Sequence, residues 1–481
     1  MPLVCAATSL DLARWQFAIT TIFHFLFVPV SIGLALYVAI CQTLHLRTGK
    51  DVYARQTLFW GRLLLISFAV GVVTGIIQEF QFGMNWSLYS RFVGDVFGAP
   101  LAMEGLAAFF LESTFLGLWI FGRGRLSPRV HLATIWCVAG GTMLSAYFII
   151  AANAWMQHPV GYRMVGGKAR LTSIGKVLFS DLTVWAFLHV VLAAVLTAAL
   201  VALAVSAWHL RRGQEVALFT SAVKIALVLA AVGALGSLYV GDELGRTLIR
   251  EQPMKMAAAE ALFDTEQPAA FSIFATGSFT HNPRHTNRDL KVPHLLSLLA
   301  TRSWSGSVPG VNQLNAQYRR RYGPGEYAPY VAVVYWSFRS MIYLWGFVLA
   351  LAASGLWLWR RGRLASSRRW LGACIAAGVL PFVMNTGGWL MTESGRQPWI
   401  VQGLLKTSQA SSPNVSAAQI WLTIVGFVAI FTVLGGVALW LFPARGAQRS
   451  ARARGGAGRG GGPGLLTRCA TIRHSRWSGS S

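Results

Sequence analysis

The chain has 481 residues, of which 54% are hydrophobic and only 12% are charged, with a formal net charge of +25. A water-facing globule of this length needs a larger charged surface, so the composition excludes a soluble globular protein and a disordered chain. The Lys and Arg residues lie almost entirely between apolar runs, which is typical of a membrane-topology signal. We therefore expect a membrane protein in contact with lipid, with no nucleic-acid partner.

Nine apolar runs of roughly 20 residues predict nine membrane-spanning helices, because lipid offers no partner for an unpaired backbone group. The predicted fold class is an all-α membrane protein, a bundle of nine transmembrane helices with a long extracytoplasmic loop between helices 6 and 7. The runs cover residues 17–42, 58–80, 99–121, 131–152, 182–208, 217–241, 329–358, 370–391 and 417–442.

The runs divide the chain into four predicted parts. Residues 1–241 hold helices 1–6, 242–328 form the long loop, and 329–443 hold helices 7–9. Residues 444–481 are rich in Arg and Gly and cannot bury a core, so we expect a disordered cytoplasmic tail.

Orientation follows from the basic residues in the short connections. Thirteen Lys and Arg residues lie in the loops after helices 1, 3, 5 and 7, against eight in the segments on the opposite side. Cytoplasmic loops carry the excess of positive charge, so the N-terminus is predicted outside and the C-terminus inside.

Only a few ionisable or ligand-type side chains lie at membrane depth, where each needs a partner, a cofactor or a water path. Counted at about 1.5 Å per residue, several of them fall in the outer half of the membrane. An imidazole, a thioether and a carboxylate are all iron ligands when presented to a haem. The candidates are His24, Glu104, His189, Met341 and Glu393.

Glu112 lies about 12 Å deeper than Glu104 on the same predicted helix and is turned only about 80° around it. Two buried carboxyl groups so arranged predict a path for protons toward the cytoplasm. The alternative is a pair of protonated, hydrogen-bonded structural glutamates.

Four segments give the chain a resemblance to a known family over roughly residues 10 to 442. They read RWQFAITTIFHFLFVP, EGLAAFFLESTFLGLW, KMAAAE and GRQPW. The chain resembles the large haem-bearing subunit of the cytochrome bd-type quinol oxidases. Its loop at 242–328 resembles the short-loop members, and its Arg/Gly tail matches nothing known in the family.

The resemblance implies three haems: a low-spin haem b, a high-spin haem b and haem d. His189 and Met341 would hold the low-spin haem b, with Arg339 beside the porphyrin. His24 and Glu393 would serve the high-spin haem b and haem d, and which ligand belongs to which stays open. The resemblance places Glu104 close by, and Arg396 and Trp389 flanking that site.

The resemblance also implies a quinol site on the outer loop, carried by Lys255 and Glu260. The alternative for this pair is an ordinary ion pair on a surface helix, although a spacing of five residues is not the favoured one. The implied activity is that of a terminal respiratory oxidase in the bacterial cell membrane. It would oxidise quinol, ubiquinol or menaquinol, and reduce dioxygen to water, building a proton gradient by charge separation without pumping.

The implied partners are a second multi-span membrane subunit and, in some members, a small accessory subunit. Two other function classes compete with this prediction. A proton-coupled transporter also places Glu and His in its spans, but typically shows repeats between its halves, which the sequence lacks. A purely structural membrane subunit would give no reason for a ligand cluster in hydrocarbon.

Overall fold

The computed structural model describes residues 8–278, 282 and 285–456. Nine segments among these residues are long and apolar enough to cross a membrane, and each overlaps one of the nine predicted runs. Seven contain the whole predicted run, and the segments Val331–Arg360 and Ala417–Leu441 miss one or two residues at one end of theirs. The first, second and fourth segments extend the predicted run by three or more residues at both ends. The segments are Ser9–Thr48, Asp51–Met84, Ser87–Phe121, Pro128–Gln157, Asp181–Arg211, Val216–Glu251, Val331–Arg360, Arg368–Ser394 and Ala417–Leu441.

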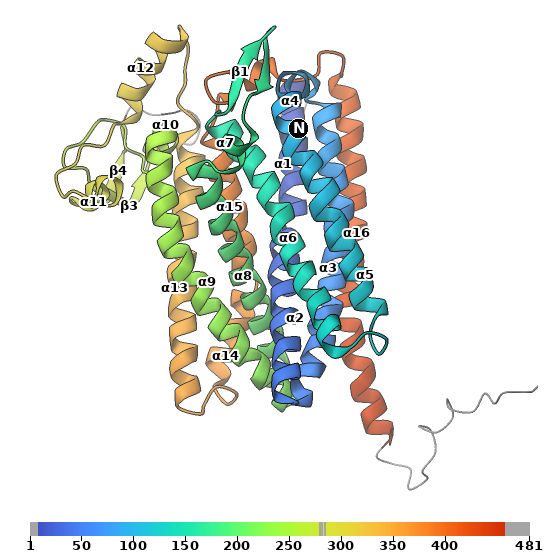
Figure 1. The fold of residues 1–481 in the computed structure, drawn as a ribbon. Coiled ribbons are helices and arrows are strands. Elements are labelled where there is room, and N and C mark those ends of the chain that lie inside the picture. Colours follow the sequence, from blue (N-terminus) through green and yellow to red (C-terminus); the bar gives the residue numbers. More distant parts are fainter. Residues whose placement is uncertain (1–7, 279–281, 283–284, 457–481) are drawn as a thin grey trace, which may run out of the picture. The chain divides into compact units, whose positions relative to one another are not determined.

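Three of the nine segments are interrupted rather than single helices (Figure 1). The elements from the first six segments are α1 (Ser9–Phe25), α2 (Val28–Thr48), α3 (Asp51–Met84), α4 (Ser87–Met103), the π-helix η1 (Glu104–Phe109), α5 (Phe110–Phe121), α6 (Pro128–Gln157), α8 (Asp181–Arg211) and α9 (Val216–Glu251). The last three segments give α13 (Val331–Arg360), α14 (Arg368–Ala377), α15 (Leu380–Ser394) and α16 (Ala417–Gly456).

Proline explains the first interruption. Pro29 has no backbone N–H, so the Phe25 carbonyl, four residues earlier, loses its helical donor and the helix breaks between α1 and α2. The break directly follows His24, one of the predicted ligands. A second proline, Pro100, lies inside α4, just before the wider π-helical turns that begin at Glu104. Such turns are frequent at functional sites.

Within residues 1–431, α2 packs against α3, α6 and α8, and α13 packs against α9 and α15. The α2–α8 contact is close because Gly33 has no side chain. A Cβ atom at Gly33 would lie 2.3 Å from the Ala194 carbonyl oxygen. The core of this part is therefore made by helices that approach one another at small residues, as is usual in membrane bundles.

The remaining elements are short and lie at the end of the helices where α1 begins (Figure 1). The hairpin β1–β2 and α7 precede α8, and the hairpin β5–β6 and the 3-10 helix η2 follow α15. The connection between α9 and α13 contains α10, the antiparallel hairpin β3–β4, α11 and α12. Their bounds are Tyr162–Val165 (β1), Lys168–Leu171 (β2), Ile174–Leu178 (α7), Pro253–Ala259 (α10), Phe271–Thr276 (β3), Arg288–Val292 (β4), Leu295–Thr301 (α11), Val311–Tyr322 (α12), Trp399–Val401 (β5), Leu405–Lys406 (β6) and Thr407–Gln409 (η2).

The long connection between the sixth and seventh spans is a packed structure rather than an open loop. Met254 and Ala258 of α10 and Tyr318 of α12 are buried in one cluster with Tyr335 of α13 and Trp399. The tail was expected to be disordered from residue 444, but the structure has helix α16 continuing to Gly456. Residues 457–481 lie outside the described residues.

Candidate functional site

His24 is held by a hydrogen bond to Thr74 of the neighbouring helix α3. Its Nδ1 lies 2.9 Å from the Thr74 hydroxyl oxygen, and that hydroxyl is within donating distance of the Val70 carbonyl at 2.9 Å. Because the hydroxyl proton is directed to a backbone carbonyl, Thr74 accepts from His24 Nδ1. This tautomer leaves the Nε2 lone pair available to a metal, which is the usual role of a second hydrogen bond to a ligand histidine.

Glu393 lies at the end of α15, close to the helix that carries His24. The ring of Trp389, one turn before Glu393, meets the ring of Phe25 edge-on at 5.2 Å between centroids. One carboxylate oxygen of Glu393 accepts from Asn153 Nδ2 at 2.9 Å, and the other pairs with the Arg396 guanidinium. The structure therefore brings Glu393 and Arg396 together, on a helix that contacts α1.

His189 and Met341 each lie against glycines of an adjacent helix. A Cβ atom on Gly241 of α9 would lie 3.5 Å from His189 Cε1, and one on Gly388 of α15 would lie 3.3 Å from Met341 Sδ. His189 Nδ1 is buried and has no hydrogen-bond partner within the described part of the chain. The two helices, α8 and α13, both pack against α9 and α15.

Arg339 and Glu260 form a buried ion pair between α13 and the end of α10. The exposed fractions of the two side chains are 1% and 5%. The guanidinium also lies over the ring of Phe271, 4.4 Å from its centroid. Arg339 Nε and Nη1 are buried without a partner among the residues that the structure describes. Two donors of a buried cation are thus left for another acceptor.

Lys255 is held by a different partner from Glu260, although both lie on or next to α10. Lys255 Nζ donates to Gln157 Oε1 at 2.6 Å. No described hydrogen bond or ion pair joins Lys255 to Glu260, and both residues are buried. An ordinary ion pair on a surface helix, the alternative from the sequence, is therefore not what this part of the chain forms.

Burial moves the pKa values of these two groups toward neutrality from opposite sides. It lowers the pKa of Lys255 to about 7, with a further lowering by the Arg396 charge that Glu393 opposes. Burial also raises the pKa of Glu260 to about 6, against the opposing effect of Arg339. Both groups can therefore exchange protons near pH 7.

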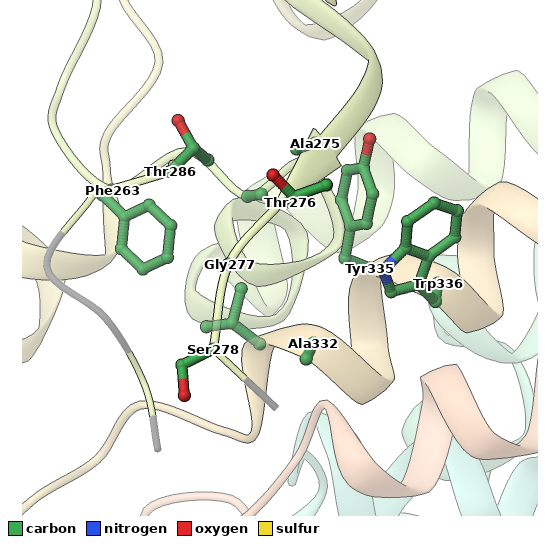
Figure 2. A pocket seen from close by; sticks show the side chains of 11 residues that line it. Phe263, Ala275, Thr276, Gly277, Ser278, Thr286, Ala332, Tyr335 and Trp336 are labelled. Atoms are coloured by element: carbon green, nitrogen blue, oxygen red, sulfur yellow. The ribbon is translucent and has the colours of Figure 1, made fainter. Parts of the chain in front are cut away.

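A pocket opens at Ala261, the residue that follows Glu260. It is shallow, partly open to solvent, and lies between the start of α13 and the end of β3. Figure 2 shows Phe263 on one side and Tyr335 and Trp336 on the other, with Thr276 and Gly277 between them. The Tyr335 hydroxyl lies 2.9 Å from the Ser272 hydroxyl, and the Ser272 backbone hydrogen-bonds to Glu260.

Glu104 and Glu112 both face α6. Ser145 Oγ donates to Glu104 Oε1 at 2.7 Å. Glu112 is buried against Gly141, where a Cβ atom would lie 2.8 Å from Glu112 Cγ. Its Oε1 has no partner among the described residues. Glu104 and Glu112 thus contact α6 at Ser145 and Gly141, which are four residues apart on that helix.

The side chains present fit a porphyrin better than a bare metal ion. No group of three or more His, Cys, Asp or Glu among the described residues could hold a metal by itself. A haem iron needs only one or two ligands from the protein, because the porphyrin supplies the rest. Like Arg339, Arg396 is buried with Nε and Nη1 unpartnered in the described structure. Such donors suit the carboxylates of haem propionates.

Three polar residues of α6 escaped the sequence analysis: Ser145, Asn153 and Gln157. Each hydrogen-bonds a predicted site residue, namely Glu104, Glu393 and Lys255 respectively. The predicted span ended at residue 152, whereas the helix continues to Gln157. Asn153 and Gln157 could have been identified in the sequence as two amides four residues apart at the end of an apolar run.

The chain matches known proteins over almost its whole length. A family model described as cytochrome bd terminal oxidase subunit I matches residues 12–448. Cytochrome bd ubiquinol oxidase subunit 1 of Bacillus subtilis (strain 168) is 48% identical over 438 residues, covering 90% of this chain and 93% of the relative. Cytochrome bd-II ubiquinol oxidase subunit 1 of Escherichia coli (strain K12) is 37% identical, covering 88% and 93%.

A solved structure agrees with these relatives. The bd oxidase from Geobacillus thermodenitrificans superimposes with a TM-score of 0.82 at 27% identity, over 91% of this chain and 98% of that chain. With the family model covering most of the chain, the resemblance found in the sequence is confirmed. The chain belongs to the cytochrome bd terminal oxidase subunit I family.

Proposed function

We propose that this protein is the haem-bearing subunit of a terminal oxidase that oxidises quinol and reduces dioxygen to water. The observation that carries the proposal is the buried Glu260–Arg339 pair, with an aromatic pocket at the adjacent Ala261 and two guanidinium donors left for a further acceptor. The competing transporter has no support from the relatives, which are oxidase subunits by name.

Membership of the family implies haem cofactors. We assign His189 and Met341 to a low-spin haem b, and His24 and Glu393 to a high-spin haem b and a haem d, in an order left open. Arg339 and Arg396 would hold propionates, and Trp389 would flank the second site. When bound, the haems would carry electrons from quinol to dioxygen.

A quinol loses two protons and two electrons when it becomes a quinone. Glu260, with a pKa of about 6, is the group we assign to accept a hydroxyl proton. Lys255, with a pKa of about 7, would hold the other quinol oxygen and orient the head group. The pocket lined by Phe263, Tyr335 and Trp336 offers the flat apolar surface that an aromatic ring prefers.

We assign the supply of protons for water formation to Glu112 and Glu104, from the cytoplasmic side. Release of the quinol protons on the outer side would then build a proton gradient without pumping. The protein is a multi-pass bacterial membrane protein by its spans and its family. An N-terminus outside is supported by the basic residues of the alternate loops.

The relatives are named as first subunits, so a second subunit belongs to the assembly. A small accessory subunit, bound lipid and the choice between ubiquinol and menaquinol are proposals of the same kind. One relative at 28% identity is named as a putative menaquinol oxidase, so the family name alone does not select the quinone.

The test is a visible spectrum and an oxygen-consumption assay on the protein purified with its partner subunit from cells with sufficient haem supply. We expect haem b and haem d bands in the dithionite-reduced spectrum and oxygen uptake that depends on quinol. A colourless preparation would overturn the proposal and favour the alternative, a proton-coupled transporter.

A further inference from the structure

Two amides at the end of α6 carry an inference beyond the assigned site. Asn153 and Gln157 are four residues apart and so lie on the same side of the helix. Gln157 Nε2 donates to Asn153 Oδ1 at 2.8 Å. Neither residue is an iron ligand or a quinol contact in the proposed function.

Each amide also holds a residue of the proposed site. Gln157 Oε1 accepts from Lys255 Nζ at 2.6 Å, and Asn153 Nδ2 donates to Glu393 Oε1 at 2.9 Å. The other oxygen of Glu393 pairs with Arg396. Three consecutive hydrogen bonds therefore join the candidate quinol lysine to the candidate iron ligand without a gap.

The direction of these bonds is set by the two ends. A lysine ammonium can only donate, so Gln157 must present its oxygen to Lys255. A carboxylate can only accept, so Asn153 must present its nitrogen to Glu393. The two requirements leave the Gln157 nitrogen facing the Asn153 oxygen, and that is the bond observed. Turning either amide over would break two of the three bonds.

Further contacts hold the same unit together. Gln252, just before α10, donates from Nε2 to the backbone carbonyl of Gln157. The aliphatic stem of Lys255 lies against Gly395, where a Cβ atom would be 2.6 Å from Lys255 Cγ. Gly395 stands between Glu393 and Arg396 in the chain. The stem of the lysine therefore packs against Gly395, and its ammonium is held by Gln157, which hydrogen-bonds the Asn153 that holds Glu393.

We propose that Asn153 and Gln157 are positioning residues that couple the quinol site to the Glu393 haem site, so that a change at one end alters the other. The inference rests on the proposed function, since it needs a quinol at Lys255 and a haem at Glu393. If the hydrogen bonds only held α6, α10 and α15 together, substituting Asn153 or Gln157 would lower stability, but a change at Lys255 would not alter the Glu393 site.

The experiment uses the purified complex and substitutes Asn153, which touches Glu393 and Gln157 but not Lys255. Asn153→Leu should raise the apparent KM for quinol about fivefold, the loss expected for one hydrogen bond of about 1 kcal/mol. Reciprocally, Lys255→Met should shift the midpoint potential and the absorption band of the haem at Glu393. That shift should disappear when Lys255→Met is made in the Asn153→Leu background.

Two further variants separate coupling from general damage. Gln157→Leu removes both the acceptor for Lys255 and the donor to Asn153, so it should reproduce the effects of Asn153→Leu. Gln42→Leu removes another buried amide, which bridges His131 and Trp119, and should leave both KM and spectrum unchanged.

A readout independent of haem loading keeps the inference testable in any variant that loses haem. The rate at which an amine reagent labels Lys255 in membranes is measured by peptide mass spectrometry, relative to Lys406. Asn153→Leu should raise this ratio severalfold. The inference is overturned if KM and labelling match wild type in Asn153→Leu while Lys255→Met leaves the haem unchanged. A wild-type complex without haem or quinol oxidation would instead overturn the proposed function.

Discussion

The sharpest prediction concerns Glu260→Gln, which removes a negative charge and a proton acceptor with almost no change in shape. The side chain is 5% exposed and its partner Arg339 is 1% exposed, so water cannot replace the lost carboxylate. A hydrogen bond to a charged group contributes about 1.5–3 kcal/mol. At about 1.4 kcal/mol for each factor of ten, kcat/KM for quinol should fall by a factor of roughly 10 to 150.

The assay is quinol-dependent oxygen consumption, with haem content measured from the reduced spectrum of the same sample. The matched control is Glu326→Gln, because Glu326 also pairs with an arginine in the connection between α9 and α13 but is 59% exposed. An exposed pair contributes little, so this variant should behave as wild type. Haem bands should persist in Glu260→Gln. A kcat/KM within twofold of wild type would refute the assignment of Glu260.

Four other outcomes follow from the same structure. Met341→Leu should abolish the low-spin haem b signature, and an unchanged reduced spectrum would contradict its assignment as a ligand. Wild-type turnover should fall below about pH 6 as Glu260 becomes protonated and above about pH 7 as Lys255 loses its charge. Lys255→Arg should move only the alkaline limb upward; an alkaline limb that stays in place would contradict its assignment to Lys255. Glu112→Gln should slow turnover more than tenfold while the spectrum is retained, which is checked by stopped-flow reoxidation. Gly33→Ala should lower thermal stability by about 1–3 kcal/mol, because its Cβ would clash with the Ala194 carbonyl.

Hydropathy predicts the nine spans because the free energy of placing a helix in lipid is a sum over local residues. It could not predict how those helices are interrupted. Pro29 and Pro100 are visible in the sequence, but whether a proline kinks a helix, breaks it or precedes a π-helix depends on the neighbouring helices. His24 and Glu104 could therefore be located from the sequence, but the helix breaks beside them could not.

The sequence also did not predict which residues far apart in the chain form pairs. Glu260 and Arg339 are separated by 79 residues in the chain, and nothing in their local context indicates that one holds the other. The resemblance named both residues, but in different roles, one with quinol and one with porphyrin. Their ion pair connects those roles, because Glu260 leaves Nε and Nη1 of Arg339 without a partner among the described residues. The Glu260–Arg339 pair forms because α10 packs against α13, and that packing could not be predicted from the sequence.

The separation of Lys255 from Glu260 has a chemical consequence that their spacing alone would not reveal. Two opposite charges on one short helix would stabilise each other if they paired, and both pKa values would move away from neutrality. Here Gln157 holds the lysine and Arg339 holds the glutamate. Burial is then the largest effect on each, so the pKa of Lys255 is lowered to about 7 and that of Glu260 is raised to about 6. A pair arranged in this way offers a proton acceptor and a cationic hydrogen-bond donor over the same narrow pH range, which is what oxidation of a quinol near pH 7 requires.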